Sequence, residues 1–317
     1  MPNWRNILSE IQVAGSTHDV IRRKYLQNLH EVTGRNVIVY YSGWLQKPEF
    51  ARRGGMEIND ADKNGFMAAI HEVDRTKGLD LLLHTPGGDA AATESLVDYL
   101  RSMFETDIRA VVPQIALSAG TMVALACKEI VMGKHSSLGP VDPQIAGVPA
   151  HGIIEEFRRA LQEVAANPAC IPLWQPIIAK YSPTLIGECE KAIEWSNQMV
   201  EEWLLSGMFA DEKEKDPKDA KGKVERIIET LGDHALTKSH ARHISLKQAR
   251  DAGIKVVALE DDDDLQEAVL TVHHACIQTL SGTGATKIIE NHKGVAYMQV
   301  VQQQIIAAGP GMATPSP

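Results

Sequence analysis

The stretch IALSAGTMVALACKEIVMGKHSSLG at residues 115–139, taken together with LLLHTPGGDA at residues 81–90, decides the fold. An apolar strand runs into a Pro-Gly-Gly turn, and further along the chain a turn of small residues presents Ser118 at the start of an apolar helix. A glycine turn leaves backbone N–H groups accessible, because glycine has no side chain to cover them, and a tight turn exposes a serine hydroxyl. Acyl-transfer enzymes need this arrangement, because the hydroxyl attacks a carbonyl carbon while the N–H groups hold its oxygen.

Composition narrows the class of protein. The chain has 317 residues, of which 44% are hydrophobic, which is enough for a substantial core. A formal net charge of -9 excludes the basic face that a nucleic-acid-binding protein needs. No segment reaches the roughly 20 apolar residues of a membrane helix. We therefore expect a soluble, cytoplasmic protein that binds no nucleic acid and has no membrane span.

The cysteines favour neither a metal nor a disulfide role. They show no CxxC spacing and no histidine partner at metal-ligand spacing. They are Cys127, Cys170, Cys189 and Cys276. We expect reduced thiols that pack in the interior, and no metal site.

The order of expected elements divides the chain into five parts. Residues 1–34 form an N-terminal helical segment, and residues 35–148 alternate strands with helices, which is typical of a parallel sheet with crossover connections. Residues 149–234 form a helical insertion, in which the dense charge run at residues 211–223 is expected to be a solvated loop. Residues 235–300 return to the core and add C-terminal helices. Residues 301–317 are a disordered tail by composition.

Four motifs in this order resemble the serine dehydrogenase proteinase family, which are Clp-fold serine peptidases distantly related to Clp protease and signal peptide peptidase A. The motifs are HTPGGDA at 84–90, ALSAGTMVALA at 116–126, EIVMGKHSSLGPVDPQ at 129–144 and SHARHISLKQARDAGIKV at 239–256. The likeness covers roughly residues 35–145 and 225–295. It implies an α/β fold, a Clp/crotonase-type spiral of parallel strands and helices, with a helical insertion and a C-terminal helical arm.

The resemblance also implies an activity. It implies a serine-type endopeptidase that cleaves peptides or unfolded protein segments without ATP and without a cofactor. Relatives of this fold form trimers, tetramers or rings, so we expect a homo-oligomer. Two other classes stay open, because the same scaffold also hosts crotonase-like enzymes that act on CoA thioesters, and because an inactive scaffold or adaptor is compatible with the sequence.

Ser118 is the candidate nucleophile. Its small neighbours, Ala119 and Gly120, would let a substrate approach the hydroxyl. The alternative is that Ser118 is an ordinary N-cap of the helix that follows. The oxyanion hole is expected from the backbone N–H groups of Gly88, or Gly87, and of Ala119.

A serine at neutral pH needs a base. In Clp protease a histidine follows the serine by about 25 residues, whereas here Asp142 stands 24 residues after Ser118. The resemblance therefore implies the order Ser118, Asp142, histidine, and a catalytic triad is defined by geometry rather than by chain order. His240 is the first choice for the base and His243 the second, because the residues after His240 depart from the family pattern. His135 is a third candidate.

A Ser-Lys dyad is the other way to activate the serine. Lys128 lies about 15 Å from Ser118 by helical rise, which is too far for proton transfer. Lys180 and Lys191 lie in the expected insertion and could fold back towards the serine. His84 precedes the Pro-Gly-Gly turn and is expected to be structural.

Overall fold

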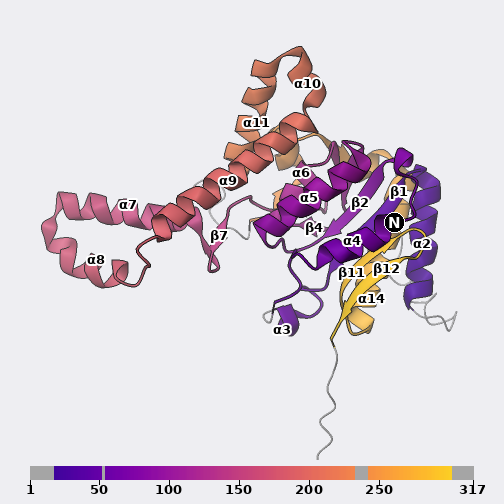
Figure 1. The fold of residues 1–317 in the computed structure, drawn as a ribbon, viewed down its shortest axis with the longest axis horizontal. Coiled ribbons are helices and arrows are strands. Elements are labelled where there is room, and N and C mark those ends of the chain that lie inside the picture. The colour runs from indigo at the N-terminus through magenta and orange to yellow at the C-terminus, as the bar shows by residue number, and fades with distance from the viewer. Residues whose placement is uncertain (1–17, 52–53, 233–241, 302–317) are drawn as a thin grey trace, which may run out of the picture.

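The computed structural model describes residues 18–51, 54–232 and 242–301. A seven-stranded sheet in the order β10-β5-β3-β2-β1-β11-β12 forms its centre (Figure 1). The strands are β1 (Asn36–Ser42), β2 (Leu79–His84), β3 (Ile108–Val112), β5 (Glu129–Met132), β10 (Val256–Ala258), β11 (Ala285–Asn291) and β12 (Ala296–Val300). The run from β10 to β1 pairs in parallel, and β11 and β12 add antiparallel. The expected α/β fold with a mostly parallel sheet is confirmed.

The two central strands are buried along their whole length. Every residue of β1 and of β2 is buried, which matches their nearly continuous apolar sequences and is typical of a parallel sheet covered on both faces. The side chains of neighbouring strand residues point to opposite faces of the sheet, so that Tyr40 packs into one apolar cluster and Tyr41 into the other.

Helices cover both faces of this sheet. The face that holds Tyr40 packs against α4 (Asp62–Ile70), α5 (Ala90–Phe104) and α6 (Ala119–Leu125). The face that holds Tyr41 packs against α2 (His18–Thr33) and α14 (Asp263–Gly282). Short helical elements lie between the main ones, namely α3 (Pro48–Ala51), η1 (Arg75–Lys77), α13 (Leu246–Asp251) and η3 (Leu259–Asp261).

A small second sheet joins distant segments beside α6. It consists of β4 (Ile115–Ala116), β6 (Ser137–Leu138) and β9 (Ile244–Ser245). The strand β4 pairs in parallel with β6, and β6 pairs antiparallel with β9, with Leu138 opposite Ile244. This sheet brings the segment after β6 next to the turn that follows β4.

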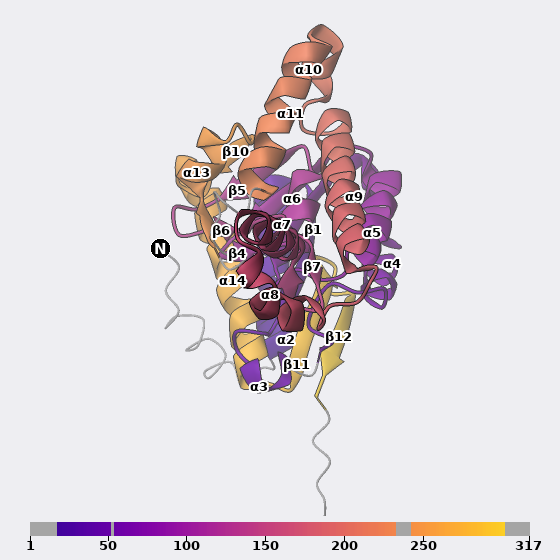
Figure 2. The ribbon, with the colours of Figure 1, turned by 90° about the vertical axis from the view of Figure 1, so that its left-hand side faces the viewer.

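Residues 144–232 leave the core and return to it. A hairpin of β7 (Gln144–Ile145) and β8 (Val148–Pro149) leads into α7 (Ala150–Ala166), η2 (Pro168–Cys170) and α8 (Ile171–Ile178). Helices α7 and α8 project away from the sheet at the left of Figure 1, and point towards the viewer in Figure 2. The long helix α9 (Leu185–Ser206) runs back to the core, where it packs on α6.

The charged run at residues 211–223 is helical, so the expectation of a solvated loop was wrong. It is divided between α10 (Ala210–Lys215) and α11 (Pro217–Gly232). Asp216 separates the two helices, and its carboxylate accepts hydrogen bonds from the N–H groups of Lys218 and Asp219. Charges four residues apart pair on the helix surface, as in Lys223 with Asp219 at 2.7 Å, and such pairs support a helix in water.

The C-terminal part of the core adds two strands beside the expected C-terminal helices. After α14 the chain forms the antiparallel hairpin of β11 and β12, which extends the sheet beside β1. The turn between them places Gly294 at φ +82°, a backbone conformation that glycine adopts without strain. The sequence KIIEN in β11 is buried at every position, so its polar residues are placed by tertiary contacts that local sequence does not reveal.

No helix within the described ranges is both long enough and apolar enough to cross a membrane. The expectations for the first 17 residues and for the tail after residue 301 fall outside the described residues.

Candidate functional site

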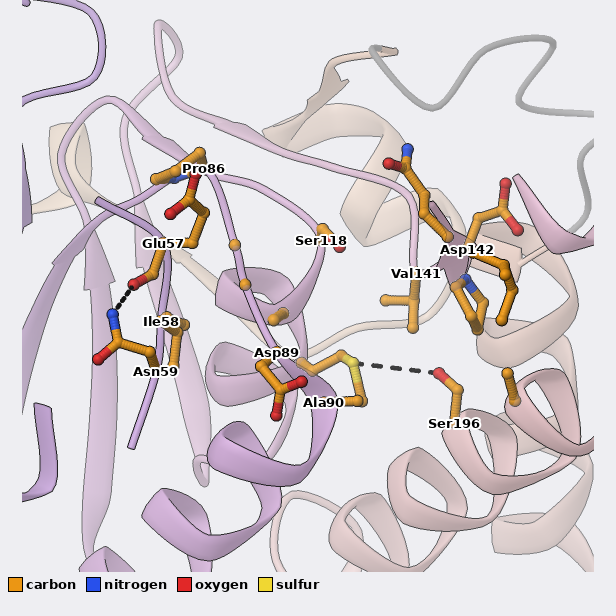
Figure 3. Close-up of a pocket in the computed structure, with 18 of the residues that line it drawn as sticks. Glu57, Ile58, Asn59, Pro86, Asp89, Ala90, Ser118, Val141, Asp142 and Ser196 are labelled. Atoms are coloured by element: carbon orange, nitrogen blue, oxygen red, sulfur yellow. Dashed lines mark hydrogen bonds between the residues drawn. The ribbon is translucent and has the colours of Figure 1, made fainter. Parts of the chain in front are cut away.

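Ser118 occupies a strained turn between β4 and α6. Its φ is +48° and its ψ is -118°, in a region that residues with a side chain rarely adopt. Its hydroxyl makes no capping hydrogen bond to α6, although its carbonyl accepts from the N–H of Met122 at 3.1 Å. The ordinary N-cap interpretation therefore does not describe this serine, whose side chain lines a cleft (Figure 3).

The Pro-Gly-Gly turn lies directly against Ser118. Backbone hydrogen bonds tie the two loops together, from Thr85 N–H to Ile115 O at 3.3 Å and from Leu117 N–H to Thr85 O at 3.0 Å. Gly87 has φ +100°, and a Cβ at this position would lie 2.8 Å from the Cβ of Ser118. The same Cβ would lie 3.0 Å from the Ala119 nitrogen. A glycine is required here because any side chain would collide with the serine turn.

Gly88 is held by a segment that the sequence did not reveal as part of the site. Ile58 forms a parallel bridge with Gly88, in which its N–H donates to Gly87 O at 2.8 Å and its carbonyl accepts from Asp89 N–H at 2.9 Å. A Cβ on Gly88 would lie 2.3 Å from the Ile58 backbone. Close backbone packing is the reason for this glycine.

The backbone N–H groups of Gly88 and Ala119 take no part in the hydrogen bonds described above. Because Gly87 O and Asp89 N–H face Ile58, the N–H and carbonyl of Gly88 point to the opposite side, as successive peptide groups alternate in an extended strand. Ala119 is the first residue of α6, so its N–H has no acceptor within the helix. Both glycines, Ala119 and Ser118 line the same cleft.

Asp142 reaches the cleft from the other side. It is 2% exposed and follows β6 by four residues. The hydroxyl of Thr121 in α6 donates to Ala116 O at 2.8 Å and accepts from Gly139 N–H at 2.9 Å, which fastens this segment to the serine turn. Figure 3 shows Ser118 between the Pro86 side and the Asp142 side of the cleft.

The cleft has a volume of about 770 Å³. One wall is the segment around Ile58 and the Pro-Gly-Gly turn, and the opposite wall comes from the β7 hairpin and from α9. Trp195 and Ser196 of α9 lie in that wall, so the projecting helical region contributes to the site. The charged side chains among the described lining residues are all acidic, namely Glu57, Asp89 and Asp142.

The described part of the cleft contains neither a histidine nor a lysine. His240 lies outside the described residues. His243 is exposed immediately before β9, and His135 is exposed after β5. His84 is completely buried on the face of the sheet that holds Tyr41, and burial lowers its pKa to about 3.

The three lysines considered for a dyad are also outside this lining. Lys180 and Lys191 are exposed on the helical region. The Lys128 ammonium pairs with Asp107 at 3.0 Å. None of the three supports activation of Ser118 by a lysine.

Comparison with known proteins gives one family. A family model described as ClpP-like SDH-type serine proteinase matches residues 20–261, which is well over half of the chain. Two similar curated proteins are uncharacterized proteins of Methanocaldococcus jannaschii. One is 32% identical over 159 residues, which cover 50% of this chain and 49% of its own. The other is 28% identical over 232 residues, which cover 73% of this chain and 70% of its own. The chain thus spans about half the length of the first relative.

Proposed function

Because the chain belongs to the ClpP-like SDH-type serine proteinase family, we propose that it is a serine endopeptidase that cleaves peptides or unfolded protein segments through an acyl-enzyme on Ser118. The observation that carries this proposal is the contact between the Ser118 turn and the Pro-Gly-Gly turn. A hydroxyl held in a strained turn, without a capping role, lines the same cleft as Gly88 and Ala119, whose backbone N–H groups are the proposed donors.

The chemistry proceeds in two halves. The Ser118 Oγ loses its proton to a base and attacks the carbonyl carbon of the scissile peptide bond. The N–H groups of Gly88 and Ala119 bind the developing oxyanion, and donors of this kind contribute about 10²–10³-fold to kcat. The base then protonates the leaving amine, and a water molecule hydrolyses the acyl-enzyme through the same steps. None of these proposed reaction steps uses a cofactor or a nucleotide.

We propose His240 as the base and Asp142 as the carboxylate that orients it. The antiparallel pairing of Leu138 with Ile244 supports this choice. In the sequence, Asp142 stands four residues after Leu138 and His240 stands four residues before Ile244, so the two positions are equally distant in sequence from this pairing. His243 is the alternative base, although its exposed position before β9 is a weaker location for this role.

The backbone of Gly88 supports the proposed substrate class. Its N–H and carbonyl point away from Ile58, and an extended peptide can pair with such an open edge. Peptides and unfolded segments have an extended backbone available for such pairing, which is the reason to propose them. The three carboxylates of the cleft disfavour coenzyme A, because they would repel its phosphate groups.

We also propose that the chain forms a homo-oligomer through the projecting helices. Large apolar side chains remain exposed there, with Leu161 of α7 at 73% and Leu173 of α8 at 69%. A second copy that covers these helices would remove that apolar surface from water. Multi-angle light scattering of the wild type and of a Leu161→Glu, Leu173→Glu variant tests this, and a monomeric wild type would contradict it.

The proposed activity is tested with a reduced and alkylated protein as the unfolded substrate. The wild type, without ATP, is expected to release peptides that mass spectrometry identifies, and the Ser118→Ala variant is expected to release none. The same substrate in its native, disulfide-bonded form is the matched control and should remain intact. Equal cleavage by Ser118→Ala would assign the activity to a contaminant or to another residue, and no cleavage by the wild type would favour an inactive scaffold.

A further inference from the structure

A buried ion pair lies outside the cleft, between the last part of the sheet and α4. The ammonium of Lys287 in β11 lies 2.7 Å from the carboxylate of Asp62, and the two side chains are 0% and 1% exposed. Burial lowers the pKa of Lys287, and the negative charge of Asp62 opposes that shift. A buried ion pair is a poor source of stability, because removing two charges from water offsets most of their attraction. The question is therefore what this pair holds in place.

Both partners bind the backbone of one short segment. The Lys287 ammonium donates to Glu57 O at 2.8 Å. The Asp62 carboxylate accepts from Asn59 N–H at 3.0 Å and from the Tyr40 hydroxyl at 2.8 Å. The pair thus holds the peptide groups on each side of Ile58.

Ile58 in turn holds the Pro-Gly-Gly turn. Its N–H donates to Gly87 O and its carbonyl accepts from Asp89 N–H, so the peptide groups on both sides of Gly88 are fixed by it. A continuous series of hydrogen bonds therefore leads from the ion pair to the Gly88 N–H that the proposed mechanism uses. No link in this series is longer than 3.0 Å.

We propose that Lys287 and Asp62 are positioning residues for the oxyanion hole, which set the Gly88 N–H against Ser118 by holding the segment 57–59. This inference rests on the proposed function of Ser118. The requirement is directional, because a donor must meet Glu57 O while an acceptor meets Asn59 N–H three residues before the start of α4. Apolar side chains of the same volume could fill the space but could not fix both peptide groups.

Tyr40 completes this arrangement. Burial and the Asp62 carboxylate raise its pKa well above the ordinary value, so its hydroxyl stays protonated at neutral pH and donates to Asp62. The Lys287 ammonium also lies 5.6 Å from the centre of the Tyr40 ring, within the range of a cation–π contact.

The same strand offers a matched control. Glu290, three residues after Lys287 in β11, pairs with Arg22 of α2 on the opposite face of the sheet, and both side chains are 0% exposed. Arg22 also donates to the Thr279 hydroxyl of α14 at 3.0 Å. This second buried pair is remote from the segment 57–59 and lines no part of the cleft.

The experiment compares two charge-removing double variants, Lys287→Met with Asp62→Asn, and Arg22→Met with Glu290→Gln. Each removes both charges of its pair, so that no single buried charge remains. The first readout is amide hydrogen exchange in peptides that cover residues 56–60 and 86–90. The second is the labelling of Ser118 by a fluorophosphonate, separated into the maximal rate kinact and the half-saturating concentration KI.

The first double variant is expected to exchange faster in both segments and to lose about 10–100-fold in kinact, because small displacements of reacting groups have effects of this size. Its KI should stay near the wild-type value, since the cleft walls are unchanged. The control should show neither effect. Lys287→Arg, which keeps the charge and the donors, should retain most of kinact. If the first double variant does not fold, Tyr40→Phe serves in its place as a milder change, and it should lose a smaller part of kinact.

Unchanged exchange in both segments of the first variant would overturn the inference, and so would equal changes in the control. A wild type that is not labelled at all would mean that the proposed function of Ser118 fails. The exchange comparison does not depend on labelling, and it would still decide whether the ion pair holds the segment 57–59.

Discussion

Gly87 and Ser118 are in such close contact that a Cβ added to Gly87 would lie 2.8 Å from the Cβ of Ser118. This contact joins the turn after β2 to the turn before α6, two segments about thirty residues apart in the sequence. It also brings the glycine backbone into the cleft that Ser118 lines, where the proposed mechanism binds the carbonyl oxygen. The catalytic interpretation depends on this packing.

Gly87→Ala is therefore expected to lower fluorophosphonate labelling of Ser118 by about 100-fold or more, in line with the loss of an oxyanion-hole donor. The new methyl group would displace the Ser118 turn or the Gly88 peptide. The matched control is Gly253→Ala, because Gly253 has φ +98° and open space around its Cβ position, whereas Gly87 has φ +100° and a crowded one. Equal labelling by the two variants would show that the contact does not matter for reactivity.

Asp142→Asn should keep the fold and lower kcat by about 10³–10⁴-fold, as expected when the carboxylate of a triad loses its charge. Peptide hydrolysis and fluorophosphonate labelling both report this loss. Asp89→Asn is the control, because Asp89 lines the same cleft but caps α5 by accepting from Ala92 N–H, a role that asparagine can perform. An Asp142→Asn variant with wild-type activity would remove Asp142 from the triad.

His240→Gln and His243→Gln distinguish the two candidate bases. His240→Gln is expected to lower labelling by about 10²–10⁴-fold, the usual contribution of a general base. His243→Gln should stay close to the wild type, because its side chain is exposed before β9. The opposite ranking would reassign the base to His243. Full activity of both variants would show that neither histidine is the general base.

Acid should destabilise the fold through His84. Burial lowers its pKa from 6.5 to about 3, and neither ring nitrogen has a hydrogen-bond partner among the described residues. Between these two pH values the unfolded chain binds a proton that the folded chain does not, so the free energy of unfolding falls as the pH drops through this window. The contribution is about 1.4 kcal/mol per pH unit for one group.

His84→Phe should reduce that pH dependence. The ring packs against Trp44 at 4.5 Å and Tyr41 at 5.3 Å between centres, an environment that suits phenylalanine. Urea unfolding at pH 7 and pH 5 should show a smaller difference for this variant than for the wild type, while His71→Gln, at an exposed position, should leave the difference unchanged. A variant with the wild-type difference would show that His84 does not carry this linkage.

Much of the fold could be predicted from local sequence. The apolar runs of β1 and β2 and the small-residue turn at Ser118 are readable because each depends on neighbouring residues. The charged run at residues 211–223 was misjudged because its helices depend on the Asp216 cap and on pairs four residues apart. The hairpin of β11 and β12 was missed because its polar residues are placed by distant parts of the chain.

The part of the site that sequence could not reveal is the part built from long-range contacts. Ile58 carries no chemical group that marks it, and it matters only because its backbone pairs with Gly88. Lys287 and Asp62 are 225 residues apart in the sequence, and neither belongs to a recognisable motif. Only the folded chain shows that they lie behind the proposed oxyanion hole.

The proposed function requires that Ser118 is an activated nucleophile. Intact-mass measurement after fluorophosphonate treatment tests it most directly, on the wild type and on Ser118→Ala at neutral pH. One adduct is expected on the wild type and none on the variant. A folded wild type that gains no adduct, or a Ser118→Ala variant that gains the same adduct, would contradict it.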